Sequence, residues 1–490
     1  MSSLPPVPLL RNRIAGIAVA ELAARFGTPT FVYDAAVILQ RLGELAAFDS
    51  VRYAQKACSN LAILDLLRRH GALVDAVSAG EIRRALAAGY PAGGEPSGGR
   101  GGPGDRRASP DRRGSPDRRG SPDPAEAGDR EVSQTRGRPS VAAVARSGDR
   151  PQPGPLNECP PIVYTADIFD AEALALCIQE GIHVNCGSPD MIDQLGRHTQ
   201  GVPGGREITL RINPGFGHGH SRKTNTGGDQ SKHGIWHEQL GECLDRAARY
   251  SLRVTGLHMH VGSGSGLQHL SQVAAAMEQA AGQVGPQVVS ISTGGGLPVP
   301  YREDEPRIDL AAYFAVWDAA RKRLEDRFGH RVRLETEPGR YIVAESGYLV
   351  AEIRAVKQQR DRWFYLLDAG FNNLARPILY GAYHPISIAP AGSQAGQRSL
   401  REVIVGGPLC ESGDIFTQTE GGYVSPIMLP EAQAGDWAVI GCAGAYGFVM
   451  GSNYNSRPLA AEVLIQDGQA REIRRRQTFE DLVRGETMPE

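Results

Sequence analysis

The run SVRYAQKA, residues 50–57, is the first of eight short segments whose β-branched and aromatic residues predict buried strands. Helix-like stretches with apolar spacing near 3.6 residues separate most of these segments. Eight strand–helix repeats favour an eight-stranded parallel α/β barrel of the TIM type over an open, doubly wound sheet. The other expected strands cover residues 73–79, 161–166, 182–187, 207–213, 254–261, 288–293 and 331–337.

The pattern changes after about residue 343, where strand-like runs such as REVIVGG and DWAVIGCAG follow one another with few helical stretches. This predicts a second, mostly antiparallel β-sandwich or β-barrel domain over residues 343–490. The segment TPTFVYD, residues 28–34, is expected to pair into that sheet. We therefore assign residues 1–34 to the β domain and residues 35–342 to the barrel.

Residues 92–158 fit neither pattern, because they are rich in Gly, Pro, Arg, Asp and Ser and contain no aromatic residue. They include RRASPDRRGSPDRRGSPD, in which a six-residue unit is written nearly three times. Such a segment cannot bury enough apolar surface to offset its ordering entropy, which predicts a disordered insertion. The insertion precedes the third expected strand, so it should leave the barrel on the face opposite the active site.

Composition narrows the class of protein. The formal net charge of −2 favours neither nucleic acid nor a membrane surface as a partner. Seven cysteines without a C-x-x-C pair indicate a reducing, cytoplasmic location and argue against disulfides or a metal site. No stretch approaches the roughly 18 apolar residues of a membrane span.

Functional side chains of such a barrel lie at the carboxyl ends of its strands. There Lys56, if partly desolvated, can form a Schiff base. The backbone of Gly294, Gly295 and Gly296 suits a phosphate group. The residues that the expected strands place at this mouth are Lys56, Ser78, Asn185, Asn213, His260, Gly294, Gly295, Gly296, Glu337, Pro338, Gly339 and Arg340.

Further residues at this mouth suit an aromatic, phosphorylated cofactor. Arg340 and Ser263 can complete a phosphate cradle. Glu337 can keep a pyridine nitrogen protonated, and His260 can lie flat against the ring. Taken alone, Lys56 could be a lysine that reaches into solvent, the glycine run could be a tight turn, and His260 could be a structural histidine of the core. Together they favour a pyridoxal phosphate site, with a sugar-phosphate enzyme that uses Lys56 as its Schiff base as the alternative.

Eight longer motifs occur in order along the chain: YAQKACSN, RINPGFGHGHSRKTNTGGDQSKHGIW, GLHMHVGSGSG, STGGGLPVPY, ETEPGRY, DAGFNNLARPILYGAYH, GPLCESGD and GAYGFVMGSNYNSRP. Together they resemble the diaminopimelate decarboxylases, which are fold-type III pyridoxal phosphate enzymes. The resemblance covers nearly the whole chain except roughly residues 92–158. It implies a homodimer that converts meso-2,6-diaminopimelate to L-lysine and carbon dioxide, the last step of lysine biosynthesis.

The resemblance also implies roles for single residues. Lys56 would carry the cofactor as a Schiff base, Glu337 would hold the ring nitrogen protonated, and His260 would stack on the ring with His258 nearby. The implied cofactor-binding set is Lys56, His260, Ser263, Gly294, Gly295, Gly296, Glu337, Pro338, Gly339, Arg340 and Tyr446.

Substrate recognition is implied in the same way. Arg376 and Tyr380, helped by Arg340, would bind the carboxylate at the end of the substrate that is not decarboxylated, and Tyr446 would lie near the phosphate and the substrate. Glu411 would bind its ammonium group. Cys410 would protonate the carbanion, from across the dimer interface. Arg376 together with Glu411 favours a substrate with a second carboxylate over ornithine or arginine. The alternative is a silent pyridoxal phosphate-binding homologue, or an interaction protein that uses the insertion.

Overall fold

The computed structural model describes residues 8–93, 159–201, 205–217, 226–262, 267–392 and 398–489. Most of the predicted insertion, residues 94–158, lies outside the described residues, so its disorder stays a prediction. Ser263 also lies outside them.

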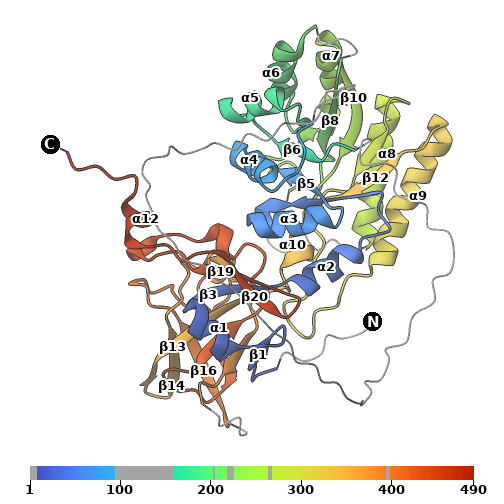
Figure 1. Cartoon of the computed structure of the whole chain (residues 1–490). Helices are drawn as coiled ribbons and strands as arrows, with labels where there is room; N and C mark the ends of the chain where they lie inside the picture. The colour runs from blue at the N-terminus through green and yellow to red at the C-terminus, as the bar shows by residue number, and fades with distance from the viewer. Residues whose placement is uncertain are drawn as a thin grey trace, which may run out of the picture. The chain divides into compact units, whose positions relative to one another are not determined.

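Eight parallel strands form a closed barrel, as the sequence predicts (Figure 1). Each strand pairs with its neighbours in chain order, and two further pairings, β8 with β10 and β12 with β4, complete the ring. The short strand β9 (Ile235–Trp236) pairs in parallel with the carboxyl end of β8. The barrel strands are β4 (Ser50–Ala54), β5 (Leu73–Ala76), β6 (Ile162–Ala166), β7 (His183–Cys186), β8 (Arg206–Asn213), β10 (Leu252–His258), β11 (Ser290–Ser292) and β12 (Arg333–Thr336).

Helices surround the barrel, and polar side chains begin several of them. Asn60 and Ser78, which follow β4 and β5, accept hydrogen bonds from backbone N–H groups of the next helix. Asp170 and Asp309 do the same for two later helices. The surrounding helices are α3 (Leu61–Arg69), α4 (Ala79–Ala87), α5 (Ala171–Gln179), α6 (Pro189–Thr199), α7 (Leu240–Arg249), α8 (Leu267–Val284) and α9 (Leu310–Phe328).

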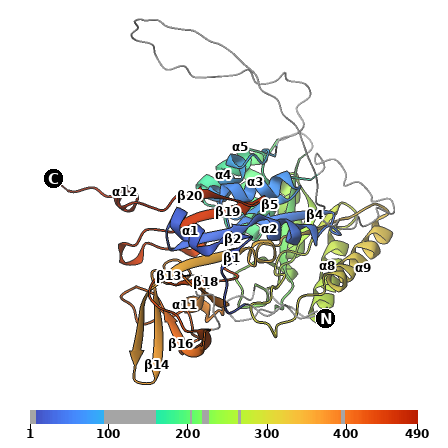
Figure 2. The same ribbon diagram turned by 60° about the horizontal axis from the view of Figure 1, so that its bottom comes forward.

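The second domain is built around the long strand β13 (Gly347–Gln359) (Figure 2). β3 (Thr30–Asp34) lies between β13, to which it is antiparallel, and β19 (Ala461–Gln466), to which it is parallel. One other pair, β14 with β16, is parallel, and the remaining described pairs of this sheet are antiparallel. The other strands are β14 (Arg362–Leu367), β15 (Ile386–Ala389), β16 (Leu400–Gly406), β17 (Ile427–Pro430), β18 (Trp437–Ile440) and β20 (Gln469–Arg474).

The barrel and the β domain share one apolar core. Leu64 of a barrel helix, Phe31 of β3 and Leu349 of β13 belong to the same buried cluster, and all three are almost completely buried. A smaller cluster packs the amino-terminal elements on the sheet. The remaining elements are β1 (Arg13–Ile14), β2 (Ile17–Ala18), α1 (Val19–Phe26), α2 (Ala35–Gly43), α10 (Arg340–Val343), α11 (Arg376–Tyr380) and α12 (Phe479–Val483).

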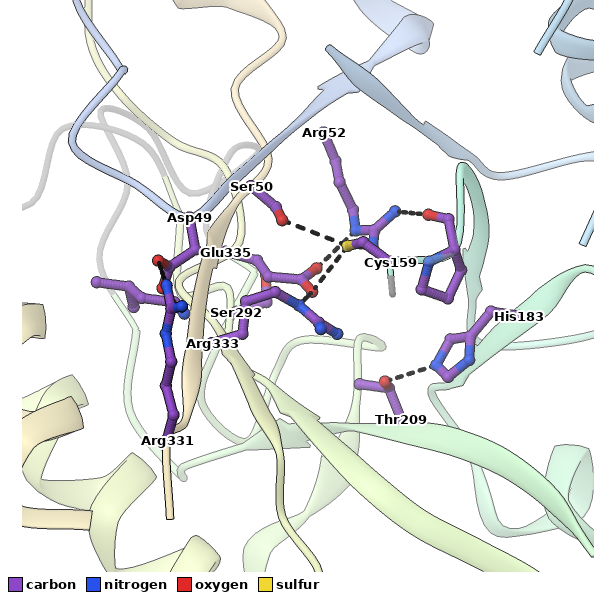
Figure 3. A network of polar contacts seen from close by, with 12 residues as sticks. Asp49, Ser50, Arg52, Cys159, His183, Thr209, Ser292, Arg331, Arg333 and Glu335 are labelled. Atoms are coloured by element: carbon purple, nitrogen blue, oxygen red, sulfur yellow. Dashed lines mark hydrogen bonds and ion pairs between the residues drawn. The ribbon is translucent and has the colours of Figure 1, made fainter. Parts of the chain in front are cut away.

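Charged side chains fill the barrel at the amino end of its strands (Figure 3). Arg52 Nε lies 2.6 Å from one oxygen of Glu335, and Arg333 Nε lies 2.8 Å from the other. Arg52 also donates to the carbonyl of Pro160 at 2.5 Å and contacts Cys159 Sγ at 3.1 Å. Burial alone would raise the pKa of Glu335, but the two arginines outweigh it and lower the pKa to about 2.

Replacing Arg52 by Leu should destabilise the fold by about 3 kcal/mol at pH 7, because it leaves a buried carboxylate with one partner fewer. The folded pKa of Glu335 lies below its unfolded value of about 4.3. The stability that its ionisation contributes is therefore complete above that pH and is lost as the pH falls towards 2. Urea unfolding across this range should show the difference between the two proteins narrowing with acid, and a difference independent of pH would contradict this account.

Candidate functional site

A cavity of about 1120 Å³ opens at the carboxyl ends of the barrel strands. Barrel residues line most of it, and the β domain contributes the rest. The structure brings together most of the residues that the sequence predicts. Those that line the cavity are Lys56, His258, His260, Gly295, Gly296, Glu337, Gly339, Arg340, Arg376, Tyr380 and Tyr446.

Of the described residues to which the resemblance assigns a role in the site, four do not line this cavity. Cys410 and Glu411 are exposed in the loop after β16, where the N–H of Cys410 donates to Asn455 Oδ1 at 2.8 Å. Gly294 lies behind the cavity wall, and its N–H donates to a serine of β11. Pro338 contributes its carbonyl to the N–H of Ala54.

Glu337 follows β12 and is held by hydrogen bonds on both carboxylate oxygens. Ser292 Oγ donates to Oε1 at 2.8 Å, and His258 Nε2 lies 2.8 Å from Oε2. The side chain is only 6% exposed. Burial alone would raise the pKa of Glu337, but its interactions with His258 and Ser292 contribute to a net lowering. The site therefore contains a fixed, ionised acceptor.

Lys56 leaves the end of β4 because residues Gln55–Ala57 form a 3₁₀ turn. Its side chain is exposed to the cavity and makes no hydrogen bond or ion pair within the described part of the chain. On the neighbouring strand β5, beside Ala54, lies Asp75, whose buried Oδ1 has no hydrogen-bond partner among the described residues. Burial and the neighbouring Glu337 raise the pKa of Asp75 to about 8, and Lys56 opposes this. The carboxyl therefore keeps its proton to a higher pH than an ordinary aspartic acid does.

Gly295 and Gly296 have to be glycine because their backbone passes very close to the backbone of other segments. A Cβ at Gly295 would lie 2.6 Å from the carbonyl oxygen of Glu337, and one at Gly296 would lie 2.3 Å from that of Gly262. Gly296 also has a φ of +97°. The N–H groups of Gly295 and Gly296 form no hydrogen bond with other described residues, so two backbone donors are available beside the cavity.

His260 lines the same wall, and its ring is neutral. Burial lowers the pKa of His260 well below its usual range, with the positive charges of Arg211 and Lys56 acting in the same direction. Its Nδ1 has no hydrogen-bond partner among the described residues. A neutral, partly buried imidazole can lie against an aromatic ring without adding a charge to the site.

The cationic end of the cavity contains two arginines. The guanidinium of Arg340 lies 5.7 Å from the ring of Tyr446, and that of Arg376 lies 4.7 Å from the ring of Tyr301. Tyr446 has a φ of +58°, which is uncommon for a residue other than glycine, and its N–H donates to Ala57 at 2.8 Å. Neither arginine forms an ion pair with a carboxylate in the described ranges.

Three residues that the sequence places at strand ends have structural roles. Ser78 caps a helix, and Asn185 Nδ2 donates to Thr165 at 3.4 Å. Asn213 organises the following loop, because its Oδ1 accepts from the N–H groups of Gly215 and Gly228. Strand-end position alone therefore does not separate chemical residues from residues that shape loops.

Sequence reasoning missed Asp75, Arg211 and Ser292, which lie at or within two residues of the carboxyl ends of their strands. Side chains two residues apart point to the same face of a strand, so Arg211 shares the inner face with Asn213, and Ser292 is likewise two residues before Gly294. Stepping inward by two residues from the predicted strand ends would have found Arg211 and Ser292, but not Asp75, which is an odd number of residues from Ser78. Within the described ranges, no cluster of three or more His, Cys, Asp or Glu side chains is placed to hold a metal ion, and none of the helices is long and apolar enough to span a membrane.

The model of the pyridoxal binding domain of pyridoxal-dependent decarboxylases matches residues 39–94 and 157–344. The diaminopimelate decarboxylase of Streptomyces coelicolor is 44% identical over 98% of this chain and 94% of that protein. That of Escherichia coli K12 is 46% identical over 94% of each. The chain belongs to the diaminopimelate decarboxylase family.

Solved structures of diaminopimelate decarboxylases have the same architecture. One crystal structure is 44% identical, covers 98% of this chain and 99% of its own, and superposes with a TM-score of 0.80. The Helicobacter pylori enzyme complexed with L-lysine is 28% identical, covers 95% and 98%, and gives 0.73. The family model stops at residue 94 and resumes at 157, so the residues between lie outside the matched domain.

The cavity fits the pyridoxal phosphate on which diaminopimelate decarboxylases depend. An unpaired lysine amine suits the aldehyde of the cofactor. A buried, ionised carboxylate suits its ring nitrogen. Arg340 and the unbonded N–H groups of Gly295 and Gly296 suit its phosphate.

Replacing Gly296 by Ala should weaken cofactor binding, because the added Cβ forces the glycine run away from Gly262. Gly285 provides the matched control: its φ is +94°, but a Cβ there meets nothing within 4 Å. Gly285→Ala should cost about 1 kcal/mol of stability and leave cofactor binding intact. Titration with pyridoxal phosphate, followed by absorbance, measures the difference. Equal affinities in the two variants would show that close packing at Gly296 does not shape the cradle.

Proposed function

We propose that this chain decarboxylates meso-2,6-diaminopimelate to L-lysine and carbon dioxide, the last step of lysine biosynthesis. The observation that carries this proposal is the presence in one cavity of Lys56, the ionised Glu337 and Arg376, which forms no ion pair with a described carboxylate. The relatives at 44–46% identity are diaminopimelate decarboxylases, which supports the same reaction.

In this proposal the barrel residues hold the cofactor. Lys56 would bind it covalently, Glu337 would accept a hydrogen bond from its ring nitrogen, and the neutral His260 would lie against its ring. Gly295 and Gly296, with Arg340, would bind the phosphate, and Tyr446 would lie beside it. When bound, pyridoxal phosphate supplies an aldehyde for amines and a protonated ring that accepts electrons.

The rest of the site would position and protonate the substrate. Arg376 and Tyr380 would bind the carboxylate that is retained, since a guanidinium forms a fork that matches a carboxylate. The bond between Cα and the other carboxylate breaks, carbon dioxide leaves, and a proton must be added at Cα. Cys410 would supply that proton, and Glu411 would bind the distal ammonium group.

Cys410 and Glu411 lie on the exposed surface and outside the cavity of their own chain. In this proposal they act on a substrate at the cavity of another copy. We therefore propose a homodimer in which each cavity is completed by the partner, and a cytoplasmic enzyme that takes its substrate from the surrounding solution.

The direct test measures carbon dioxide release from meso-diaminopimelate by the protein loaded with pyridoxal phosphate, together with formation of L-lysine. Absorbance of the bound cofactor shows independently that the site is loaded. A loaded protein that releases no carbon dioxide would support the silent homologue instead. No feature of the described residues favours that alternative.

Shared active sites make a prediction about mixed dimers. Lys56→Ala and Cys410→Ala should each be inactive alone, because each dimer lacks one group in both cavities. After mixing and subunit exchange, about a quarter of the wild-type sites should be restored, since half of the dimers are mixed and each has one intact cavity.

The matched control mixes Lys56→Ala with Glu337→Gln. Both groups belong to the same chain's cavity, so every mixed dimer has two damaged cavities and activity should not return. Carbon dioxide release before and after exchange measures both mixtures. Recovery in the control, or none in the first mixture, would contradict shared sites.

A further inference from the structure

Arg376, at the start of α11, contacts two side chains to which the proposed reaction assigns no role. Its Nη1 lies 3.0 Å from His384 Nε2, and its guanidinium lies 4.7 Å from the ring centre of Tyr301. The rings of Tyr301 and His384 meet edge to face, with centres 5.4 Å apart. Arg376 is 6% exposed and His384 is 4% exposed. The three side chains therefore form one packed group at the cavity wall.

The hydrogen bonds of His384 determine where its proton lies. Nδ1 is 3.1 Å from the carbonyl oxygen of Gly441, and a carbonyl can only accept, so Nδ1 carries the hydrogen. Burial, and then the charge of Arg376, lower the pKa of His384 to about 3, so the ring is neutral at pH 7. Nε2 is therefore an acceptor, and it receives a hydrogen bond from the guanidinium of Arg376.

A neutral acceptor orients Arg376 without cancelling its charge. The groups that act most strongly on the pKa of this guanidinium, after its burial, include Tyr301, Arg340 and Tyr446, and no described carboxylate forms an ion pair with it. A buried cation without an anion is costly, and binding an anionic ligand relieves that cost. Had an aspartate or glutamate stood at position 384, it would have oriented the arginine equally well but competed with the ligand for it.

Tyr301 contributes a different kind of support. It lines the cavity, and its aromatic face is a surface on which a guanidinium is attracted by the ring quadrupole. The ring restricts the guanidinium of Arg376, and His384 fixes one of its nitrogens. The remaining N–H donors stay available for a planar, bidentate partner such as a carboxylate.

We propose that His384 and Tyr301 are positioning residues that make the site selective for a substrate with a second carboxylate. His384 acts as a neutral acceptor that aims Arg376, and Tyr301 acts as the platform against which it is held. The inference rests on the proposed function and adds to it the origin of selectivity between dicarboxylic diamino acids and simple diamines.

The test compares two ligands of the pyridoxal phosphate-loaded protein by calorimetry. L-lysine retains one carboxylate, whereas 1,5-diaminopentane has none. In His384→Leu the affinity for L-lysine should fall by about tenfold or more, because a hydrogen bond to a charged group is lost. The affinity for 1,5-diaminopentane should stay as in the wild type. In turnover, KM for meso-diaminopimelate should rise by a similar factor while kcat changes little.

Conservative variants separate positioning from general damage. His384→Gln keeps an acceptor and a donor and should recover part of the lost selectivity. Tyr301→Phe keeps the aromatic face and should bind L-lysine as the wild type does, whereas Tyr301→Leu should bind it about fivefold more weakly. If His384→Leu does not fold, the Gln and Tyr301 variants still decide the question.

His183 is the matched control for loss of a buried histidine. It lies at the amino end of the barrel, 2.9 Å from Thr209, and burial likewise lowers its pKa to about 3. His183→Leu should reduce stability without changing the ratio of the two affinities. A wild-type ratio in both His384→Leu and Tyr301→Leu would overturn the inference while leaving the proposed function intact. A wild-type protein that releases no carbon dioxide would instead overturn the proposed function.

Discussion

Charged side chains lie on the inner face of the closed barrel. A buried charge there is stable only when opposite charges or hydrogen bonds compensate for its lost hydration. Strand alternation puts Arg333, Glu335 and the following Glu337 on one side of β12. At the lower level Glu335 is neutralised by Arg52 and Arg333. At the upper level Glu337 is held by Ser292 and His258, beside the cavity. One strand thus stabilises the fold at one end and presents a fixed carboxylate to the site at the other.

Several polar side chains that line the cavity lack such compensation from other described residues. Lys56, Arg340 and Arg376 are among the cavity cations that form no ion pair with a described carboxylate, and Asp75 is a buried carboxyl with an unbonded oxygen. Polar groups left incomplete in a cavity mark where ligand groups are expected. Uncharged neighbours such as His384 orient these side chains but supply no opposite charge.

The sequence predicted the barrel well because each strand and helix is set by a local pattern. It also predicted Lys56 and Glu337, which stand at or just beyond strand ends. It did not predict the role of His384, because its partner Gly441 is 57 residues away along the chain and no local pattern relates them. Cys410 and Glu411 came from a motif alone, and a single chain does not bring them to its own cavity.

The contact between Arg52 and the Cys159–Pro160 segment also bears on protein engineering. This contact attaches the segment that leads into β6 to the side chain of Arg52 on β4. Lys56 lies just past the carboxyl end of β4. A domain inserted between residues 93 and 159 would therefore join the barrel beside this contact, at the end of the barrel away from Lys56 and the cavity.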